Sequence, residues 1–115
     1  MLTRRADFVA ANRGLRVARP GFVLLTHPNG GCGIRYGITV TRKVGNAVVR
    51  NRMKRRFREL LREALPVAGL PDHDHVLIGR ETGIERDFAS MREDLATALA
   101  RAAAGKGDKP RPRRR

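Results

Sequence analysis

The sequence predicts an α+β fold: a two-layer domain in which helices pack on one mixed sheet of about four strands. Three features of the chain indicate this class. Strand-like runs separated by turn residues fill the first half, a long amphipathic segment occupies the middle, and a short apolar run precedes a second amphipathic segment. The expected order is αβββαβα. With 115 residues, we expect one RNA-binding domain over 1–105 and a disordered basic tail over 106–115.

The first half of the chain predicts one short helix and three strands. Residues 3–12 have helical spacing, with Gly14 as a stop signal. Residues 15–26 are rich in β-branched and apolar side chains, and Pro20-Gly21 divides them into two strands. A third strand is expected over 34–41, where apolar and other residues alternate. The turn over 27–31 would join the second and third strands in a hairpin.

The second half predicts a helix, a strand and another helix. Asn46 is a suitable N-cap for a helix that continues to Leu65 and meets Pro66, followed by a loop over 66–74. The nearly all-apolar run 75–79 is typical of a strand covered by a helix. The last helix is capped near Asp87, and its apolar residues recur at steps of three and four: Phe88, Met91, Leu95, Ala98, Leu99 and Ala102.

Charge points to a polyanionic partner. The chain holds 25 Lys and Arg against 11 Asp and Glu, a net charge of +14. Nine of the basic residues lie between Arg42 and Arg62 with one acid, Glu59, among them. No apolar run approaches the roughly 20 residues that span a bilayer, so no membrane partner is expected. The single cysteine, Cys32, excludes an intramolecular disulfide and favours a reducing compartment, which we expect to be the cytoplasm.

The helix 46–65 separates its side chains into two faces at about 100° per residue. Exposed helices usually mix both signs of charge, but this one offers only Glu59 and Glu63 near its end, which favours a nucleic-acid surface over a solvated one. Arg50 falls within the apolar arc, where it either reaches a ligand or extends to solvent as a structural residue. The apolar face holds Val49, Met53, Phe57, Leu60, Leu61, Ala64 and Leu65, and the cationic face Arg52, Lys54, Arg55, Arg56, Arg58 and Arg62.

Candidates for a catalytic or metal site are weak. Residues 72–75 supply metal-type ligands, but they have no matching second group, so a polar loop is the expectation. Cys32 lies between two glycines and has no paired base. We therefore expect no catalytic residue and no metal ligand in the protein itself.

The segment 37–56, with its Arg50-Asn51-Arg52 triplet, resembles the signature of the bacterial ribonuclease P protein component, and looser similarity covers about 3–104. The resemblance implies a left-handed βαβ crossover through the basic helix, against the usual right-handed preference. It also implies the protein subunit of an endoribonuclease that removes the 5′ leader from precursor tRNA. The catalytic site would be on the RNA subunit, with Mg²⁺ held mainly by that RNA, and no obligate protein partner is expected.

The resemblance further assigns residues to two ligands. Asn12 and Leu25 stand where the family commonly has aromatic residues, so fewer platforms remain for stacking on the leader. The leader of precursor tRNA would contact Phe8, Phe22, Arg42 and Lys43. The catalytic RNA would contact Arg50, Asn51, Arg52, Lys54, Arg55, Arg58 and Arg62.

Two other function classes remain open from composition. A general RNA-binding or ribosome-associated protein without a role in cleavage would carry a similar charge. A DNA-binding regulator is the third class, but the basic helix lacks a short-turn helix partner of the helix-turn-helix kind.

Overall fold

The computed structural model describes residues 10–11 and 14–107. The strands are β1 Leu15–Ala18, β2 Phe22–Pro28, β3 Arg35–Thr39 and β4 His73–Gly79. The helices are α2 Ala47–Ala68 and α3 Phe88–Ala103, with a 3-10 turn, η1, at Glu81–Gly83. Ala10 and Ala11 are helical, whereas the rest of the expected first helix and the tail from residue 108 lie outside the described residues.

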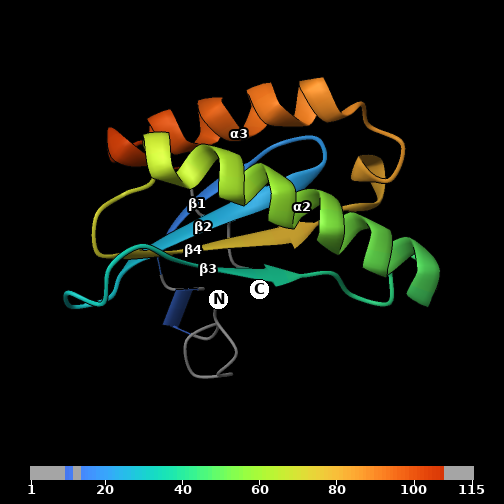
Figure 1. The fold of residues 1–115 in the computed structure, drawn as a ribbon, viewed down its shortest axis with the longest axis horizontal. Helices are drawn as coiled ribbons and strands as arrows, with labels where there is room; N and C mark the ends of the chain where they lie inside the picture. Colours follow the sequence, from blue (N-terminus) through green and yellow to red (C-terminus); the bar gives the residue numbers. More distant parts are fainter. Residues whose placement is uncertain (1–9, 12–13, 108–115) are drawn as a thin grey trace, which may run out of the picture.

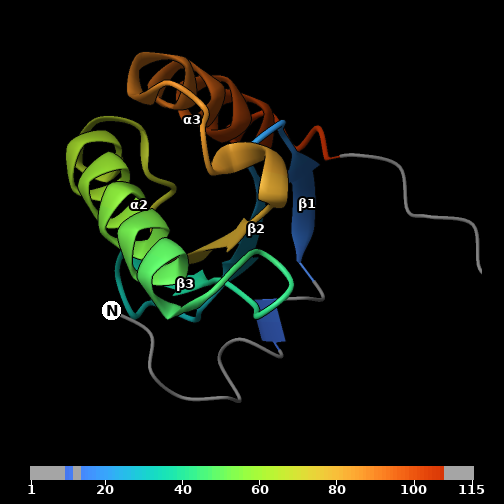
Figure 2. The same ribbon diagram turned by 90° about the vertical axis from the view of Figure 1, so that its right-hand side faces the viewer.

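The four strands form one mixed sheet in the order β1-β2-β4-β3. The pairs β1–β2 and β2–β4 are antiparallel, and β3 runs parallel to β4 at the edge. α2 and α3 lie side by side on one face of the sheet (Figures 1 and 2). On the opposite face Ala11 packs against Val23, Leu25 and Val76. The predicted α+β class with a mixed four-stranded sheet is confirmed.

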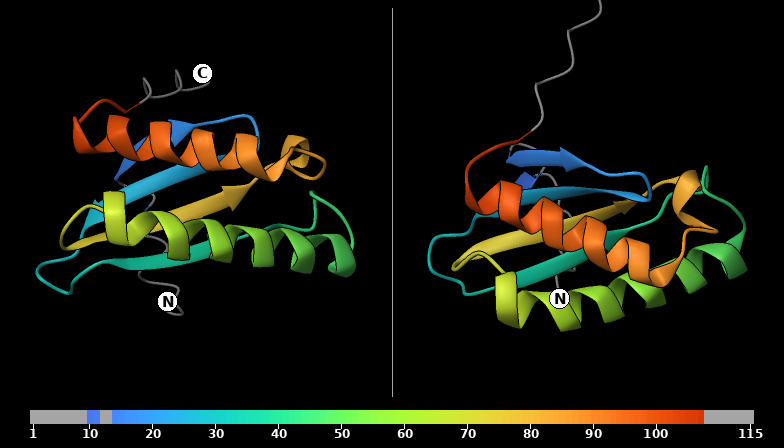
Figure 3. Two further views of the ribbon diagram at one scale, coloured as in Figure 1. Left: turned by 45° about the horizontal axis from the view of Figure 1, so that its top comes forward. Right: turned by 90° about the horizontal axis from the view of Figure 1, so that it is seen from above.

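The crossover from β3 through α2 to β4 is left-handed, as the resemblance implied. In the right-hand view of Figure 3, α2 lies in front of the sheet and the parallel strands point to the right. The chain moves upward in that view from β3 to β4, and this is the rare hand for a βαβ unit.

The expected hairpin between the second and third strands is wrong. β4 inserts between β2 and β3, so the connecting loop must pass the end of β4. The backbone N–H of Asn29 donates to the carbonyl of Asp72 (2.9 Å), and the N–H of Gly33 donates to the Asp72 carboxylate (2.9 Å). Gly30, Gly31 and Gly33 adopt positive φ, which lets the loop bend without strain. The apolar run of β4 takes a central position because there it is paired on both sides.

The start and phase of α2 follow the sequence. The side chain of Asn46 caps the helix by accepting the backbone N–H of Val49 (3.0 Å). Phe57 packs edge-on against Phe22 with ring centroids 6.0 Å apart. Gly79 of β4 leaves room for Met53, since a Cβ there would lie 2.5 Å from the sulfur of Met53. The buried side chains of α2 are Met53, Phe57, Leu60, Leu61 and Leu65.

The predicted end of this helix at Leu65 is wrong, because α2 continues through Pro66 to Ala68. A proline in the last turn removes a single hydrogen bond, to the carbonyl four residues earlier. The buried side chains of Leu65 and Leu70 hold the chain on both sides of it, and the N–H of Gly69 donates to the carbonyl of Leu65 (2.9 Å). Tertiary packing therefore outweighs the tendency of Pro66 to end the helix.

The expected polar loop over 72–75 is wrong too, because β4 begins at His73 and buries the next two residues. Arg35 forms an ion pair with Asp74 (Nε to Oδ1, 2.7 Å), and the side-chain amide of Asn29 donates to the same oxygen (3.0 Å). Burial would raise the pKa of Asp74, but these hydrogen bonds outweigh it and the pKa lies below its ordinary value. Polar partners therefore stabilise the entry of β4 into the sheet.

The predicted cap and apolar spacing of the last helix are confirmed. The Asp87 carboxylate accepts the backbone N–H of Ser90 (2.9 Å), and α3 buries Met91, Leu95, Ala98, Leu99 and Ala102. In the part of the chain that the structure describes, neither helix has the length and apolar character needed to cross a bilayer.

Candidate RNA interface

The residues expected to contact catalytic RNA all lie on α2, four of them on its outer side and three on the flank that faces β3. Asn51, Arg52, Arg55 and Arg62 are exposed. Arg50, Lys54 and Arg58 are half-buried, because they lie nearer the sheet. The apolar face of the helix is buried at the same time, so folding itself turns the cations toward solvent.

Arg56 departs from the expected cationic face. Its guanidinium donates to the carbonyls of Ile84 (3.4 Å) and Arg86, and it lies 6.0 Å from the centre of the Phe88 ring. These contacts join α2 to the segment before α3. Arg56 is therefore a structural residue, and the surface available to RNA on this helix lacks it.

Arg50 has the position within the apolar arc that the sequence indicated. Its Nε is buried and has no hydrogen-bond partner among the described residues. An unsatisfied buried donor of this kind costs free energy unless a ligand or water supplies the acceptor. The structure is thus compatible with the ligand-contact interpretation of Arg50.

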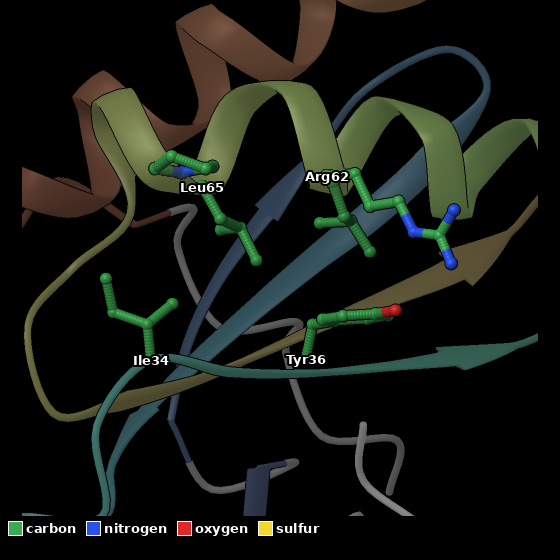
Figure 4. Close-up of a pocket in the computed structure, with 6 residues that line it drawn as sticks. Ile34, Tyr36, Arg62 and Leu65 are labelled. Carbon is green, nitrogen blue, oxygen red and sulfur yellow. The ribbon is translucent and has the colours of Figure 1, made fainter.

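One flank of α2 faces the edge strand β3. Arg50, Lys54 and Arg58 follow one another at four-residue steps, about 6 Å apart along the axis. Beyond them, a groove of about 370 Å³ opens between β3 and the C-terminal half of α2. Ile34, just before β3, and Tyr36 of β3 line one side, and Arg62 and Leu65 of α2 line the other (Figure 4). The alternation over 34–41 predicted a strand but not this groove, because the groove forms only where β3 packs beside α2.

Of the two aromatic residues expected to contact the leader, the structure describes only Phe22. Phe22 is fully buried between the sheet and α2, so its ring offers no stacking surface and that expectation is wrong. Strand alternation explains this, since Phe22 and Leu25 are three residues apart on β2 and must face opposite sides. Leu25 faces the side on which Ala11 packs. Phe8 lies outside the described residues.

Arg42 and Lys43 lie in the turn between β3 and α2. Both are exposed, while the neighbouring Val40 and Val44 are buried and anchor the turn. The turn is closed by the N–H of Val44, which donates to the carbonyl of Thr41 (3.1 Å). The two cations are thereby held at the end of the sheet from which α2 begins.

The described residues form no cluster of three or more His, Cys, Asp or Glu side chains that could hold a metal ion. Cys32 is exposed and free. His75 is buried, with its Nε2 accepting the backbone N–H of Leu70 (3.0 Å) and its Nδ1 paired with the carbonyl of Arg35 (3.0 Å). The potential ligands in this region are therefore used to hold the fold.

A mixed sheet covered by an arginine-rich helix, in a chain of net charge +14, defines a small basic RNA-binding protein. A family model described as Ribonuclease P matches residues 1–103. The ribonuclease P protein component of Erythrobacter litoralis is 74% identical, covering 100% of this chain and 95% of the relative. That of Paramagnetospirillum magneticum is 41% identical, covering 90% and 82%.

Solved structures agree with these relatives. The ribonuclease P protein of Thermotoga maritima is 36% identical with a TM-score of 0.77, covering 88% of this chain and 98% of that one. The Staphylococcus aureus protein is 30% identical with a TM-score of 0.75, covering 88% and 93%. The chain belongs to the ribonuclease P protein family, whose members associate with the ribonuclease P RNA. It is a subunit of the endoribonuclease that removes the 5′ leader from precursor tRNA.

Proposed function

We propose that this subunit binds two RNAs at once: the catalytic RNA through the outer side of α2, and the 5′ leader of precursor tRNA elsewhere on the molecule. The observation that carries the proposal is the cationic side of α2, which leaves Asn51, Arg52, Arg55 and Arg62 exposed. Guanidinium groups form paired hydrogen bonds with phosphates and stack on bases, so this side suits a folded RNA. Arg50, Lys54 and Arg58 extend the same contact.

The leader contact is assigned to Phe8, Arg42 and Lys43. Arg42 and Lys43 are held at the exposed turn before α2, where they can reach the phosphates of a single strand. The family resemblance adds the ring of Phe8, which belongs to the segment leading to Ala11, and Ala11 packs on the sheet face that holds Val23, Leu25 and Val76. Leu25 leaves this face without the aromatic residue common in the family, so phosphate contacts carry more of the binding.

The chemistry is assigned to the RNA subunit with its Mg²⁺. In this proposal the protein neutralises phosphates that otherwise need extra magnesium, and it holds the leader. The working unit is a single domain over 1–105 with a basic tail, in the cytoplasm, where tRNA precursors are processed.

Comparison of two substrates tests the two-ligand proposal. The affinity of the holoenzyme for precursor tRNA and for mature tRNA is measured with wild-type protein and with Arg42→Ala/Lys43→Ala. The double variant should weaken precursor binding and leave mature tRNA, which lacks the leader, nearly unchanged. Equal losses for both substrates would remove these residues from the leader path.

A further inference from the structure

The groove between β3 and α2 has the properties of a ligand site. Its volume of about 370 Å³ falls in the range of small-molecule pockets. Its walls are mainly apolar, and Ile34 at its mouth is 45% exposed, although it is a large hydrophobic residue. Figure 4 shows the hydroxyl end of Tyr36 and the guanidinium of Arg62 directed toward the same end of the groove. The groove would therefore fit a ligand that carries an apolar ring beside an anionic group.

We propose that this groove takes one unstacked base of the catalytic RNA, with the base against the ring of Tyr36 and its phosphate at Arg62. Unpaired bases of folded RNAs are commonly bound by stacking on aromatic side chains and guanidinium planes. The proposal rests on the proposed docking of catalytic RNA along α2. It adds a specific contact to what is otherwise a phosphate-binding surface.

Charge favours RNA as the occupant. The groove continues the flank of Arg50, Lys54 and Arg58, and the residues that line it include no acid: Ile34, Tyr36, Leu61, Arg62, Leu65 and Pro66. On the helical wheel, Glu59 falls on the outer side of α2 and Glu63 toward the other flank, where it forms an ion pair with Arg92 of α3 (2.5 Å). An RNA strand that follows the flank of Arg50, Lys54 and Arg58 therefore reaches the groove without meeting a carboxylate of α2.

Tyr36 is suited to hold a base in place. It is half-buried and packs against the core, so its ring is already fixed before RNA binds. A fixed aromatic ring stacks on a base at a low cost in conformational entropy. The rival occupant is a peptide added to the open edge of β3, a mode that uses backbone hydrogen bonds of an edge strand.

The single tyrosine of the chain gives a direct test. The full-length protein is prepared with 3-fluorotyrosine, which places one fluorine label at residue 36. Fluorine NMR is recorded before and after addition of one equivalent of catalytic RNA, and RNA binding is measured independently. The proposal predicts that the signal shifts on binding and loses its sensitivity to a soluble relaxation agent. A bound complex in which the signal stays unshifted and accessible overturns the groove contact while the RNA-binding function stands.

Variants separate stacking from folding. Tyr36→Leu retains apolar packing but removes the ring, and it should weaken the affinity for catalytic RNA by about 5-fold or more. Tyr36→Phe keeps the ring and should stay within about 2-fold of wild type, as should Val67→Ala, which alters a residue that is 89% exposed and outside the groove. Melting temperature is measured for each.

The outcomes distinguish the base contact in the groove from the docking of catalytic RNA on α2. Wild-type affinity in a stably folded Tyr36→Leu holoenzyme contradicts base stacking and leaves the groove to another class of ligand, such as a peptide at β3. Absence of any binding of catalytic RNA by the wild-type protein would overturn the docking of RNA on α2 and the groove contact together.

Discussion

At the residue scale, two buried polar side chains at the start of β4 have hydrogen-bond partners within the fold. Asp74 is 2% exposed and His75 is fully buried, yet each has defined partners. Because Nε2 of His75 accepts the N–H of Leu70, its Nδ1 carries the proton and donates to the carbonyl of Arg35. The ring is therefore neutral in the folded protein.

Acid should destabilise the protein through His75. Burial lowers the pKa of His75 in the folded state, whereas the unfolded chain protonates this ring near pH 6.5. As the pH falls from 7 toward 5, the unfolded state binds the additional proton, so the free energy of unfolding decreases. Melting temperature should fall over this window, while Asp74, with its lowered pKa, stays ionised throughout it.

A variant isolates this effect. His75→Gln should be less stable than wild type at pH 7 but should show a flatter pH dependence of melting temperature between pH 7 and 5. His27 and His73 are present in both proteins and cancel in the comparison. Parallel curves for the two proteins would show that another group causes the acid sensitivity.

Phe8 is predicted to be a stacking platform for the leader. Phe8→Leu keeps an apolar side chain but removes the aromatic face, so precursor tRNA should bind more weakly, by up to about 1–3 kcal/mol for one stacked base. Mature tRNA should be unaffected. If both RNAs bind more weakly and the melting temperature drops as well, the ring has a packing role.

At the scale of the element, α2 divides its arginines between two tasks. Arg55 is exposed, whereas its neighbour Arg56 turns toward the carbonyls of Ile84 and Arg86. The sequence could place both on a polar face, because the wheel separates apolar from charged residues. It could not reveal which arginine would meet the segment before α3, since that contact depends on tertiary packing.

This division predicts opposite results for two adjacent substitutions. Arg56→Ala should lower stability by about 1–3 kcal/mol, because it removes hydrogen bonds from a charged group that join α2 to the segment before α3. Arg55→Ala should leave the melting temperature unchanged and weaken binding of catalytic RNA, with a salt slope reduced by about 1. Thermal melting and salt-dependent RNA binding are measured for both variants. A loss of stability in Arg55→Ala together with a loss of RNA affinity alone in Arg56→Ala would contradict these roles.

At the scale of the whole molecule, the fold class followed from periodicity, but the connectivity of the sheet did not. The apolar run at 75–79 indicated a covered strand, and it is the central β4. Local turn signals at 27–31 suggested a hairpin, because no local pattern reports that a strand from a distant segment will insert. Phe22 was wrongly assigned to the leader contact. It lies three residues before Leu25 on β2, so strand alternation places the two side chains on opposite faces of the sheet.

The basic tail is predicted to act on RNA affinity alone. Within the tail expected over 106–115, residues 108–115 contain five basic side chains and no apolar one, so their removal should not affect the core. The truncated protein should melt at the wild-type temperature and bind catalytic RNA more weakly, with less dependence on salt. Replacing the five basic residues with Gln is the control for length, and a lowered melting temperature in either variant would indicate that the tail packs on the domain.

Cleavage of precursor tRNA at limiting magnesium tests the central claim most directly. The cognate catalytic RNA is assayed alone, with the wild-type protein, and with Arg52→Ala/Arg55→Ala at the same concentration. Wild-type protein should restore release of the 5′ leader at magnesium concentrations where the RNA alone is nearly inactive. The double variant should need more protein or more magnesium for the same rate. Equal cleavage rates with and without the wild-type protein, at every magnesium concentration, would contradict its role as the ribonuclease P subunit.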